Sequence, residues 1–450
     1  MSNGTIQSLI DNQSTGQATI TGGTITDGIY NYGILTVGEK DGIINKEIPT
    51  ITGSRYGVQN NGTFNFYDGT IKGKTNAITG AVTEIEEGYE IIKETIEGYE
   101  VKYLDKLPIA KLVNKDKEYT DFQEAINDAE TGETIEILRD ATFISSTETF
   151  EVPESKNITI DIKGYILTRA NSTLLNNKGT LEIKDSGKGE EDSKTYGKIE
   201  NTRGTTITNT ETGTLTIANG TITGNKGIEN SGTGKVTIND GNITSSGANG
   251  DVNAAIINIS SGTIEVNGGT LNGSWSWNRG IRNTASGKVI INDGKVFATS
   301  DGQALENSGT GTIEINGGTI QGSDGIKNSG TLNVTNGTIS ASYNGIYNYN
   351  KGQVIITGGT ITSYIANYGS LTMSNGTIQS LIDNQSTGQA TITGGTINNG
   401  ISNFGTLNVS GGTIKGNNYA ITNAGGTVNI ENVTLADSNI GISNNSGIVN

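Results

Sequence analysis

The stretch GTIQGSDGIKNSGTLNVTNG, residues 318–337, decides the fold. It divides into three short pieces separated by glycine, asparagine or serine, and within the pieces aliphatic residues alternate with polar ones. In the last piece a single polar residue separates Leu332 from Val334, so both aliphatic side chains lie on one face of a β-strand. A strand this short buries almost nothing by itself. Successive segments of this kind must therefore stack on one another to form a continuous interior.

The same arrangement recurs along most of the chain, with about 20 residues per repeat. It predicts an all-β fold, a right-handed parallel β-solenoid with three strands per coil, and one short capping helix. Glycine, asparagine and threonine are poor helix formers, which disfavours helices in the repeats. The composition agrees, because the 450 residues include 66 glycines and only 32% are apolar, too few for a conventional large core.

An asparagine follows the aliphatic residue of the second strand by two positions in coil after coil, as in Ile326 and Asn328. If the coils are in register, these asparagines form one column, in which each side-chain amide donates to the carbonyl oxygen of the next at a strand spacing of roughly 4.8 Å. A buried polar group without such a partner would cost about 1–3 kcal/mol, so the repeated asparagine indicates hydrogen bonds between neighbouring coils. The expected ladder consists of Asn177, Asn209, Asn230, Asn258, Asn283, Asn307, Asn328, Asn348, Asn367, Asn384, Asn403, Asn423 and Asn444.

Residues 111–140, KLVNKDKEYTDFQEAINDAETGETIEILRD, depart from this pattern. Thr120 and Gln123 have the spacing of a capping box, which marks the start of a helix. The apolar residues that follow recur on one helical face, so we expect one amphipathic helix over 121–129. The residues on that face are Phe122, Ala125, Ile126 and Ala129.

Residues 110–168, with this helix and the strand-like pieces TIEIL and NITIDIKGYILT, resemble the amino-terminal cap of bacterial pectate-lyase-like β-helices, in which a short helix covers the open end of the first coil. The coils that follow, with their GTI and TLxI pieces, are similar to the repeats of large bacterial surface and adhesin proteins. The resemblance implies the fold and this class of protein, but no particular activity. A cap in mid-chain also implies that one solenoid ends before it and another begins after it.

The expected organisation therefore has four parts. The first solenoid has ladder positions at Asn12, Asn31 and Asn60, and its column stops near Gly80. The acidic segment that follows contains the motif EGYE twice, and we interpret it as two strands that close the first solenoid. The predicted parts are the end of a first β-solenoid (1–80), acidic junction strands (81–107), a cap with the amphipathic helix and the first strands (108–168), and a second β-solenoid that continues into the next module (169–450).

One stretch of 25 residues occurs twice, at 1–25 and at 373–397. Met1 thus corresponds to Met373, in the middle of a third strand, whereas Val449 and Asn450 begin the same strand without finishing it. We expect the two ends to be complementary halves of one coil. Such a contact is head to tail and does not close, so it predicts a filament, built either of tandem modules in one longer chain or of stacked subunits.

The net charge of −16 disfavours nucleic acid and anionic membrane surfaces as partners, because both select basic patches. The sequence has no apolar run of 18 residues, so we expect no membrane insertion, and it contains no signal-peptide pattern. Cysteine and histidine are absent, which excludes disulfides, thiolate or imidazole metal ligands and the usual general base.

Exposed aromatic residues are candidates for ligand binding. Trp275 and Trp277 alternate in GSWSWNRG and are expected to share a face, where they would either stack on sugar rings or shield the wall beneath them. Tyr349, Tyr368 and Phe404 each follow a ladder asparagine by one residue, which predicts an outward aromatic row. The first two of these lie in adjacent coils and are expected to stack.

Carboxylates concentrate in the acidic junction and in the loop GKGEEDSK at 187–194. Such oxygen-rich clusters can hold Ca²⁺, but charge runs are more often solvated, and no ligand set is assigned. A polysaccharide lyase of this fold would need carboxylates converging on one face, whereas Asp240 and Asp293 lie in turns. An ice-binding solenoid would need an unbroken second threonine column, which Gln321 interrupts.

These observations favour a structural, non-enzymatic protein: a module of a long extracellular bacterial fibre or surface filament that stacks head to tail through complementary half-coils. The alternative is an adhesin that binds glycans or a host surface with the solenoid wall. The expected partners are the protein itself and, in the alternative, glycans. The expected location is extracellular or at the cell surface, and no cofactor is required.

Overall fold

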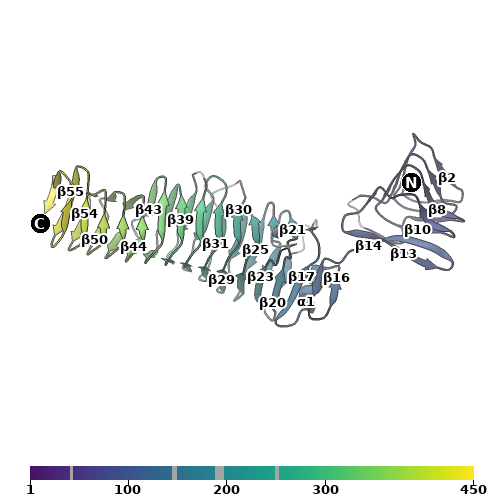
Figure 1. The fold of residues 1–450 in the computed structure, drawn as a ribbon, viewed down its shortest axis with the longest axis horizontal. Coiled ribbons are helices and arrows are strands. Elements are labelled where there is room, and N and C mark those ends of the chain that lie inside the picture. The colour runs from purple at the N-terminus through teal and green to yellow at the C-terminus, as the bar shows by residue number, and fades with distance from the viewer. Residues whose placement is uncertain (41–43, 144–148, 188–196, 249–252, 300) are drawn as a thin grey trace. The chain divides into compact units, whose positions relative to one another are not determined.

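The computed structural model describes residues 1–40, 44–143, 149–187, 197–248, 253–299 and 301–450. They form two compact units, unit 1 from Met1 to Pro108 and unit 2 from Ile109 to Asn450. Each is a right-handed parallel β-solenoid, and a coil takes about 21 residues, which confirms the predicted fold class. Figure 1 shows the strands of unit 2 following one another in chain order along the solenoid.

Unit 1 has three parallel stacks of strands, and each coil contributes one strand to each stack. The first stack contains β1 (Thr5–Ile6), β4 (Thr24–Ile25), β7 (Thr50–Gly53) and β10 (Thr70–Gly73). The second contains β2 (Ile10–Asn12), β5 (Ile29–Asn31), β8 (Tyr56–Asn60) and β11 (Asn76–Thr79), and the third contains β3 (Gln17–Ile20), β6 (Ile34–Val37), β9 (Thr63–Phe66) and β12 (Glu84–Ile85).

The acidic segment of unit 1 forms an antiparallel hairpin of β13 (Tyr89–Ile96) and β14 (Tyr99–Lys106). Strand β14 pairs antiparallel with β10, so the hairpin ends the parallel stacking on that sheet. Leu104 of β14 is 1% exposed and belongs to the core of unit 1.

Unit 2 has the same three-strand coil. Its first strands form one 14-stranded sheet: β18 (Ala141–Phe143), β21 (Ile166–Arg169), β24 (Lys198–Asn201), β27 (Thr221–Gly224), β30 (Asn242–Ser245), β33 (Thr270–Gly273), β36 (Lys295–Ala298), β39 (Thr319–Gly322), β42 (Thr338–Ala341), β45 (Thr360–Ile361), β48 (Thr377–Ile378), β51 (Thr396–Ile397), β54 (Thr413–Lys415) and β56 (Thr434–Ala436).

The second and third strands of unit 2 share a 29-stranded sheet. The second strands are β19 (Phe150–Val152), β22 (Leu175–Asn177), β25 (Thr205–Asn209), β28 (Lys226–Asn230), β31 (Ala254–Asn258), β34 (Arg279–Asn283), β37 (Gln303–Asn307), β40 (Asp324–Asn328), β43 (Asn344–Asn348), β46 (Tyr364–Asn367), β49 (Ile382–Asn384) and β52 (Ile401–Asn403). The third strands are β17 (Glu133–Ile137), β20 (Asn157–Asp161), β23 (Thr180–Lys184), β26 (Thr214–Ile217), β29 (Lys235–Ile238), β32 (Thr263–Val266), β35 (Lys288–Ile291), β38 (Thr312–Ile315), β41 (Thr331–Val334), β44 (Gln353–Ile356), β47 (Ser370–Met373), β50 (Gln389–Ile392) and β53 (Thr406–Val409). In the last two coils β55 (Tyr419–Ile430) and β57 (Ile440–Val449) span both positions.

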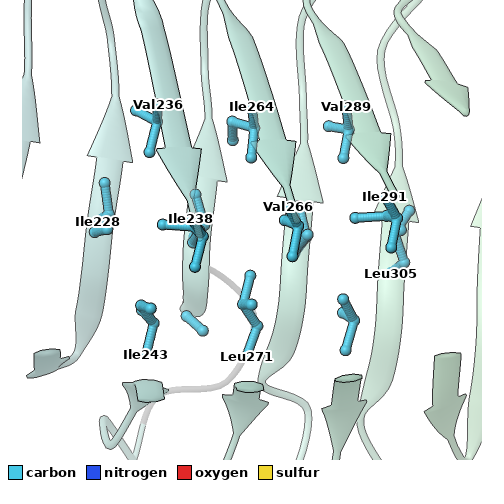
Figure 2. Packing of buried hydrophobic residues seen from close by; sticks show 14 of the residues in the cluster. Ile228, Val236, Ile238, Ile243, Ile264, Val266, Leu271, Val289, Ile291 and Leu305 are labelled. Carbon is cyan, nitrogen blue, oxygen red and sulfur yellow. The ribbon is translucent and has the colours of Figure 1, made fainter. Parts of the chain in front are cut away.

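Aliphatic side chains of equivalent strands form straight columns in the interior, as Figure 2 shows for the coils around β29, β32 and β35. Val236 stacks on Ile264, which stacks on Val289 through the parallel register of the three strands. All three side chains are fully buried. Each such residue contributes about 1.5–3 kcal/mol on burial, so the core gains the same increment from every added coil.

The cap of unit 2 consists of β15 (Ala110–Leu112), β16 (Lys117–Tyr119) and α1 (Phe122–Asp128), which is the only helix among the described residues. Strand β15 pairs antiparallel with both β16 and β17. The Phe122 ring meets Phe150 of β19 edge to face, with the ring centroids 5.1 Å apart. The helix thus lies on the first coil, where the sequence placed it.

The predicted capping box is wrong in its residues. Asp121, not Thr120, caps the helix, because its side chain accepts hydrogen bonds from the backbone amides of Gln123 and Glu124. The side chain of Gln123 turns outward to the sheet instead, where its Nε2 and Oε1 bond to the carbonyl and amide of Glu151 at 2.9 and 2.7 Å. Asp121, one residue after the predicted cap, accepts hydrogen bonds from the first backbone amides of the helix. The side chain of Gln123 is therefore free to hold the helix on β19.

Acid is expected to weaken the cap only at very low pH. Hydrogen bonds from Lys117 and then Tyr119 lower the pKa of Asp128 from 3.8 to about 2. A carboxylate whose folded pKa is depressed adds stability that is fully present above its unfolded pKa, about 4, and is lost as the pH falls through about 2. We expect NMR titration of the Asp128 carboxyl to give that low midpoint, and Asp128→Asn to remove this part of the acid response. A midpoint near 4 would contradict the pairing.

Candidate functional site

The asparagine column is the most regular polar feature of unit 2. Every predicted member except the last, Asn444, donates from Nδ2 to Oδ1 of the asparagine in the next coil, beginning with Asn177 to Asn209 at 2.8 Å and ending with Asn423 to Asn444 at 3.0 Å. The intervening bonds lie between 2.8 and 3.1 Å. The predicted ladder is therefore confirmed, in direction as well as in membership. A shorter ladder in unit 1 joins Asn12, Asn31 and Asn60.

The same amide also holds the bend between the second and third strands. Nδ2 of Asn307 donates to the carbonyl oxygen of Gly311 in its own coil at 2.9 Å as well as to Asn328 in the next. A Cβ on Gly311 would lie 2.3 Å from Nδ2 of Asn283 and 2.2 Å from the carbonyl oxygen of Gly287. Glycine is thus required at this bend because the preceding coil lies so close, and the asparagine both turns the chain and links the coils.

A second ladder, which we did not predict, lies on the exposed side of the third-strand turns. Asn267 donates to Asn239 at 3.0 Å, Asn292 to Asn267 at 2.9 Å and Asn316 to Asn292 at 3.0 Å. Thr335 then donates its hydroxyl to Asn316 at 2.9 Å. The sequence carries the signal as ND or NG directly after four successive third strands, β29, β32, β35 and β38, a pattern that is also typical of turns.

The duplicated stretch adopts the same local structure in both units. The backbone amide of Thr21 donates to the carbonyl of Met1 at 2.7 Å, and Thr393 donates to Met373 at 2.8 Å. The two methionine side chains also end over equivalent glycines, because a Cβ on Gly23 or Gly395 would lie 2.6 or 2.5 Å from the respective methionine Cε.

At the other side of the expected seam, Val449 pairs with Val428 and continues the aliphatic column of the third strands. Asn450 donates from Nδ2 to Oδ1 of Asn429 at 2.8 Å, and Asn429 donates in the same way to Asn408 at 2.7 Å. These three asparagines form a row along the outer side of the third strands. Val449 is 39% exposed, whereas Leu371 in the same column is 1% exposed. Val449 therefore lies in a third-strand position, as expected, whereas Met1 and Asn450 lie just outside the strands. The contact between the two ends stays a prediction.

Trp275 and Trp277 lie in a turn between β33 and β34, where their side chains are 51% and 54% exposed. The prediction that the two side chains share a face assumed a strand. This segment is not a strand, so the alternation of faces does not apply to it. The carbonyl of Trp275 accepts from the amide of Asn278 at 3.0 Å, and that of Trp277 accepts from Nη1 of Arg279 at 2.8 Å. Their backbone thus closes the turn while both rings face solvent.

The outward aromatic row has a different centre from the one predicted. Tyr347 of β43 packs against Tyr349, with centroids 4.7 Å apart, and against Tyr368 of the next coil at 5.3 Å. Burial, followed by a hydrogen bond with Tyr368, raises the pKa of Tyr347 to about 12. The ring that joins the two coils is therefore that of Tyr347, which lies one residue before the ladder asparagine Asn348. The predicted row included only aromatic residues that follow a ladder asparagine, so it did not contain Tyr347.

Two glutamates of the acidic junction in unit 1, Glu84 and Glu94, bond to tyrosine or lysine side chains. Glu84 accepts from Tyr67 at 2.7 Å and pairs with Lys40, and its hydrogen bond with Lys40 lowers its pKa. Glu94 accepts from Tyr103 at 2.7 Å. Within the described ranges, no group of three or more acidic side chains is placed to hold a metal ion. Residues 190–192 of the second acidic loop lie outside those ranges.

No protein-family model, curated protein or solved structure matches this chain. The described part of the chain contains no helix with the length and apolar character needed to cross a membrane.

Proposed function

We propose that this chain is a structural module of a long extracellular fibre or surface filament, in which modules stack head to tail. The observation that carries the proposal is the unbroken register of the asparagine and aliphatic columns from Asn177 to Asn444. At roughly 4.8 Å per coil, these columns make a rod about 60 Å long.

The last coil of unit 2 supports stacking. Strand β57 pairs with β55 along one edge, and no described strand pairs with its other edge. Ile440 and Ile448 on this strand are 48% and 56% exposed. An edge strand with unpaired backbone groups and exposed aliphatic residues is a template for another strand. In the proposed filament the neighbouring module would pair with this edge and cover both side chains.

The helical cap supports the class of protein. Its arrangement on the first coil resembles the caps of bacterial pectate-lyase-like β-helices, and we extend the resemblance to a bacterial surface protein. The absence of cysteine and histidine from the sequence is compatible with a chemically inert secreted fibre.

Electron microscopy and sedimentation of the 450-residue chain test the proposal. We expect rods longer than one molecule that lengthen as the protein concentration rises. Val449→Asp is expected to shorten them, because it places a charge in the aliphatic column at the seam. Val113→Asp is the matched control, since Val113 is 42% exposed and lies in the cap. Single rods at every concentration, or equal behaviour of the two variants, would contradict head-to-tail stacking.

Binding of glycans by the solenoid wall is the second candidate function. The exposed aromatic residues around Tyr347 favour it over a purely structural role for that part of the wall, because aromatic rings exposed to solvent are common in sites that recognise ligands with both apolar and polar faces.

A further inference from the structure

We propose a binding site for a neutral oligosaccharide at the corner between the second and third strands of unit 2, centred on Tyr349 and the groove beside it. The proposal rests on the second candidate function and does not depend on filament formation. It differs from the tryptophan site considered above in its residues and in its position on the wall.

The groove arises from alternating turn lengths. The turns at 329–330 and 368–369 have two residues, whereas those at 349–352 and 385–388 have four. Because the coils are in register, the longer turns form ridges and the shorter ones form troughs between them. An open groove of about 510 Å³ lies here, with Lys351 and Thr387 from the ridges and Ser370 from the trough among its lining residues.

The lining of the groove is polar and almost uncharged. The first residues of four neighbouring third strands, in register across β41, β44, β47 and β50, line it. They are Thr331, Gln353, Ser370 and Gln389. These hydroxyl and amide groups both donate and accept hydrogen bonds, as the hydroxyls of a sugar do. Among the described residues, Lys351 is the one charged side chain in this lining, and none of their carboxylates lines the groove.

An aromatic side chain of the corner supplies apolar contact area. Tyr349, the first residue of the ridge turn that also contains Asn350 and Lys351, is 40% exposed. Tyr347 holds Tyr349 in place through its ring contact at 4.7 Å and is itself fixed by Tyr368. A ring anchored in this way loses little conformational entropy when a ligand binds.

Polar pairs fix the ends of the aromatic patch. Tyr364 donates its hydroxyl to Asp383, which also accepts from Nε2 of Gln385 at 2.5 Å. At the other end, Asn344 donates to Asp324 at 2.7 Å, and Lys327 pairs with the same carboxylate at 3.0 Å. Asp324 is thus bonded through both carboxylate oxygens and Asp383 through Oδ2, while Oδ1 of Asp383 is buried. Aromatic faces and neutral polar groups remain for the ligand.

This combination selects a neutral glycan. A sugar ring has an apolar C–H face that packs on an aromatic ring, and hydroxyls at its edge that suit the amides and hydroxyls of the groove. The chain's net charge of −16 repels a polyanion, and one cation in the lining, Lys351, is too little positive charge to offset that repulsion. A peptide would offer fewer hydroxyls for this row of side chains, so peptide binding is an outcome that the test must distinguish.

Affinity electrophoresis of the whole chain in gels that contain galactomannan, mixed-linkage β-glucan or dextran tests the site, with polygalacturonate as the acidic control. We expect at least one neutral polysaccharide to retard the protein and polygalacturonate to have no effect. Tyr349→Ala and Gln353→Ala are each expected to weaken the apparent affinity about tenfold, the loss typical of removing a central contact.

Two controls locate the site. Phe404→Ala removes a ring that is 42% exposed and follows a ladder asparagine as Tyr349 does, but lies outside this groove, so it is expected to change the affinity less than twofold. Trp275→Ala/Trp277→Ala tests the other aromatic pair. Loss of binding only in the tryptophan variant would overturn the proposed site while retaining glycan binding as a function. Failure of every neutral polysaccharide to retard the protein, or a preference for polygalacturonate, would overturn both. In the same gels, a soluble unstructured peptide added as competitor is expected to leave the retardation unchanged, and its abolition by the peptide would also overturn both.

Discussion

Asn307→Ala is expected to lower the local stability of the solenoid by about 3 kcal/mol. The Asn307 side chain is 1% exposed, donates to Gly311 and to Asn328, and accepts from Asn283. Alanine removes all three hydrogen bonds and leaves Oδ1 of Asn328 and the carbonyl of Gly311 buried without this donor. Each buried polar group that loses its partner costs about 1–3 kcal/mol, which gives the expected total.

Native-state hydrogen exchange would measure this loss in β37 and β40, and Asn292→Ala provides the control. Asn292 also belongs to an asparagine ladder, with bonds to Asn267 and Asn316, but that ladder is exposed. Water can replace its hydrogen bonds, so we expect a cost below about 0.5 kcal/mol. Similar losses in the two variants would show that burial does not decide the strength of the ladder.

Phe64→Ala is expected to lower the melting temperature of unit 1 by roughly 12–40 °C and to leave unit 2 unchanged. Phe64 and Phe66 are fully buried and stack with their centroids 5.8 Å apart. Removing a buried phenylalanine ring costs about 3–5 kcal/mol, and each kcal/mol shifts the melting temperature of a domain of about 100 residues by about 4–8 °C.

Calorimetry combined with tryptophan emission would separate the two units, because Trp275 and Trp277, the only tryptophans in the sequence, both belong to unit 2. The control is Phe404→Ala, which removes a ring that is 42% exposed and is expected to shift neither transition by more than about 2 °C. A shift of the tryptophan signal in Phe64→Ala would show that the two units unfold together.

The solenoid and its ladder could be predicted because their signals are local and repeated. An aliphatic residue two positions before an asparagine means little once, but its recurrence from Asn177 to Asn444 leaves one arrangement in which all the amides find partners. The coil length and the helical cap followed from the same reasoning, since each depends on residues close in sequence.

Features that depend on competition between nearby groups could not be predicted in this way. Thr120 and Asp121 are both good helix caps, and the choice of Asp121 depends on the attachment of Gln123 to β19. Tyr347 became the centre of the aromatic cluster because neighbouring coils place Tyr349 and Tyr368 around it. The groove beside them depends on how the turn lengths of four neighbouring coils alternate. The sequence of one repeat does not show this alternation.

The uniform direction of the buried ladder gives the solenoid an electric axis. Every amide in it points the same way, and each group of this kind carries a dipole of about 3.5 D, so the moments add instead of cancelling. Asn177 presents a carbonyl oxygen that accepts no hydrogen bond from the described residues, whereas Asn444 presents its N–H groups at the opposite end. The dipole of the ladder therefore has its negative end toward the cap and its positive end at the last coil, so this contribution favours contact between unlike ends of two rods over contact between like ends.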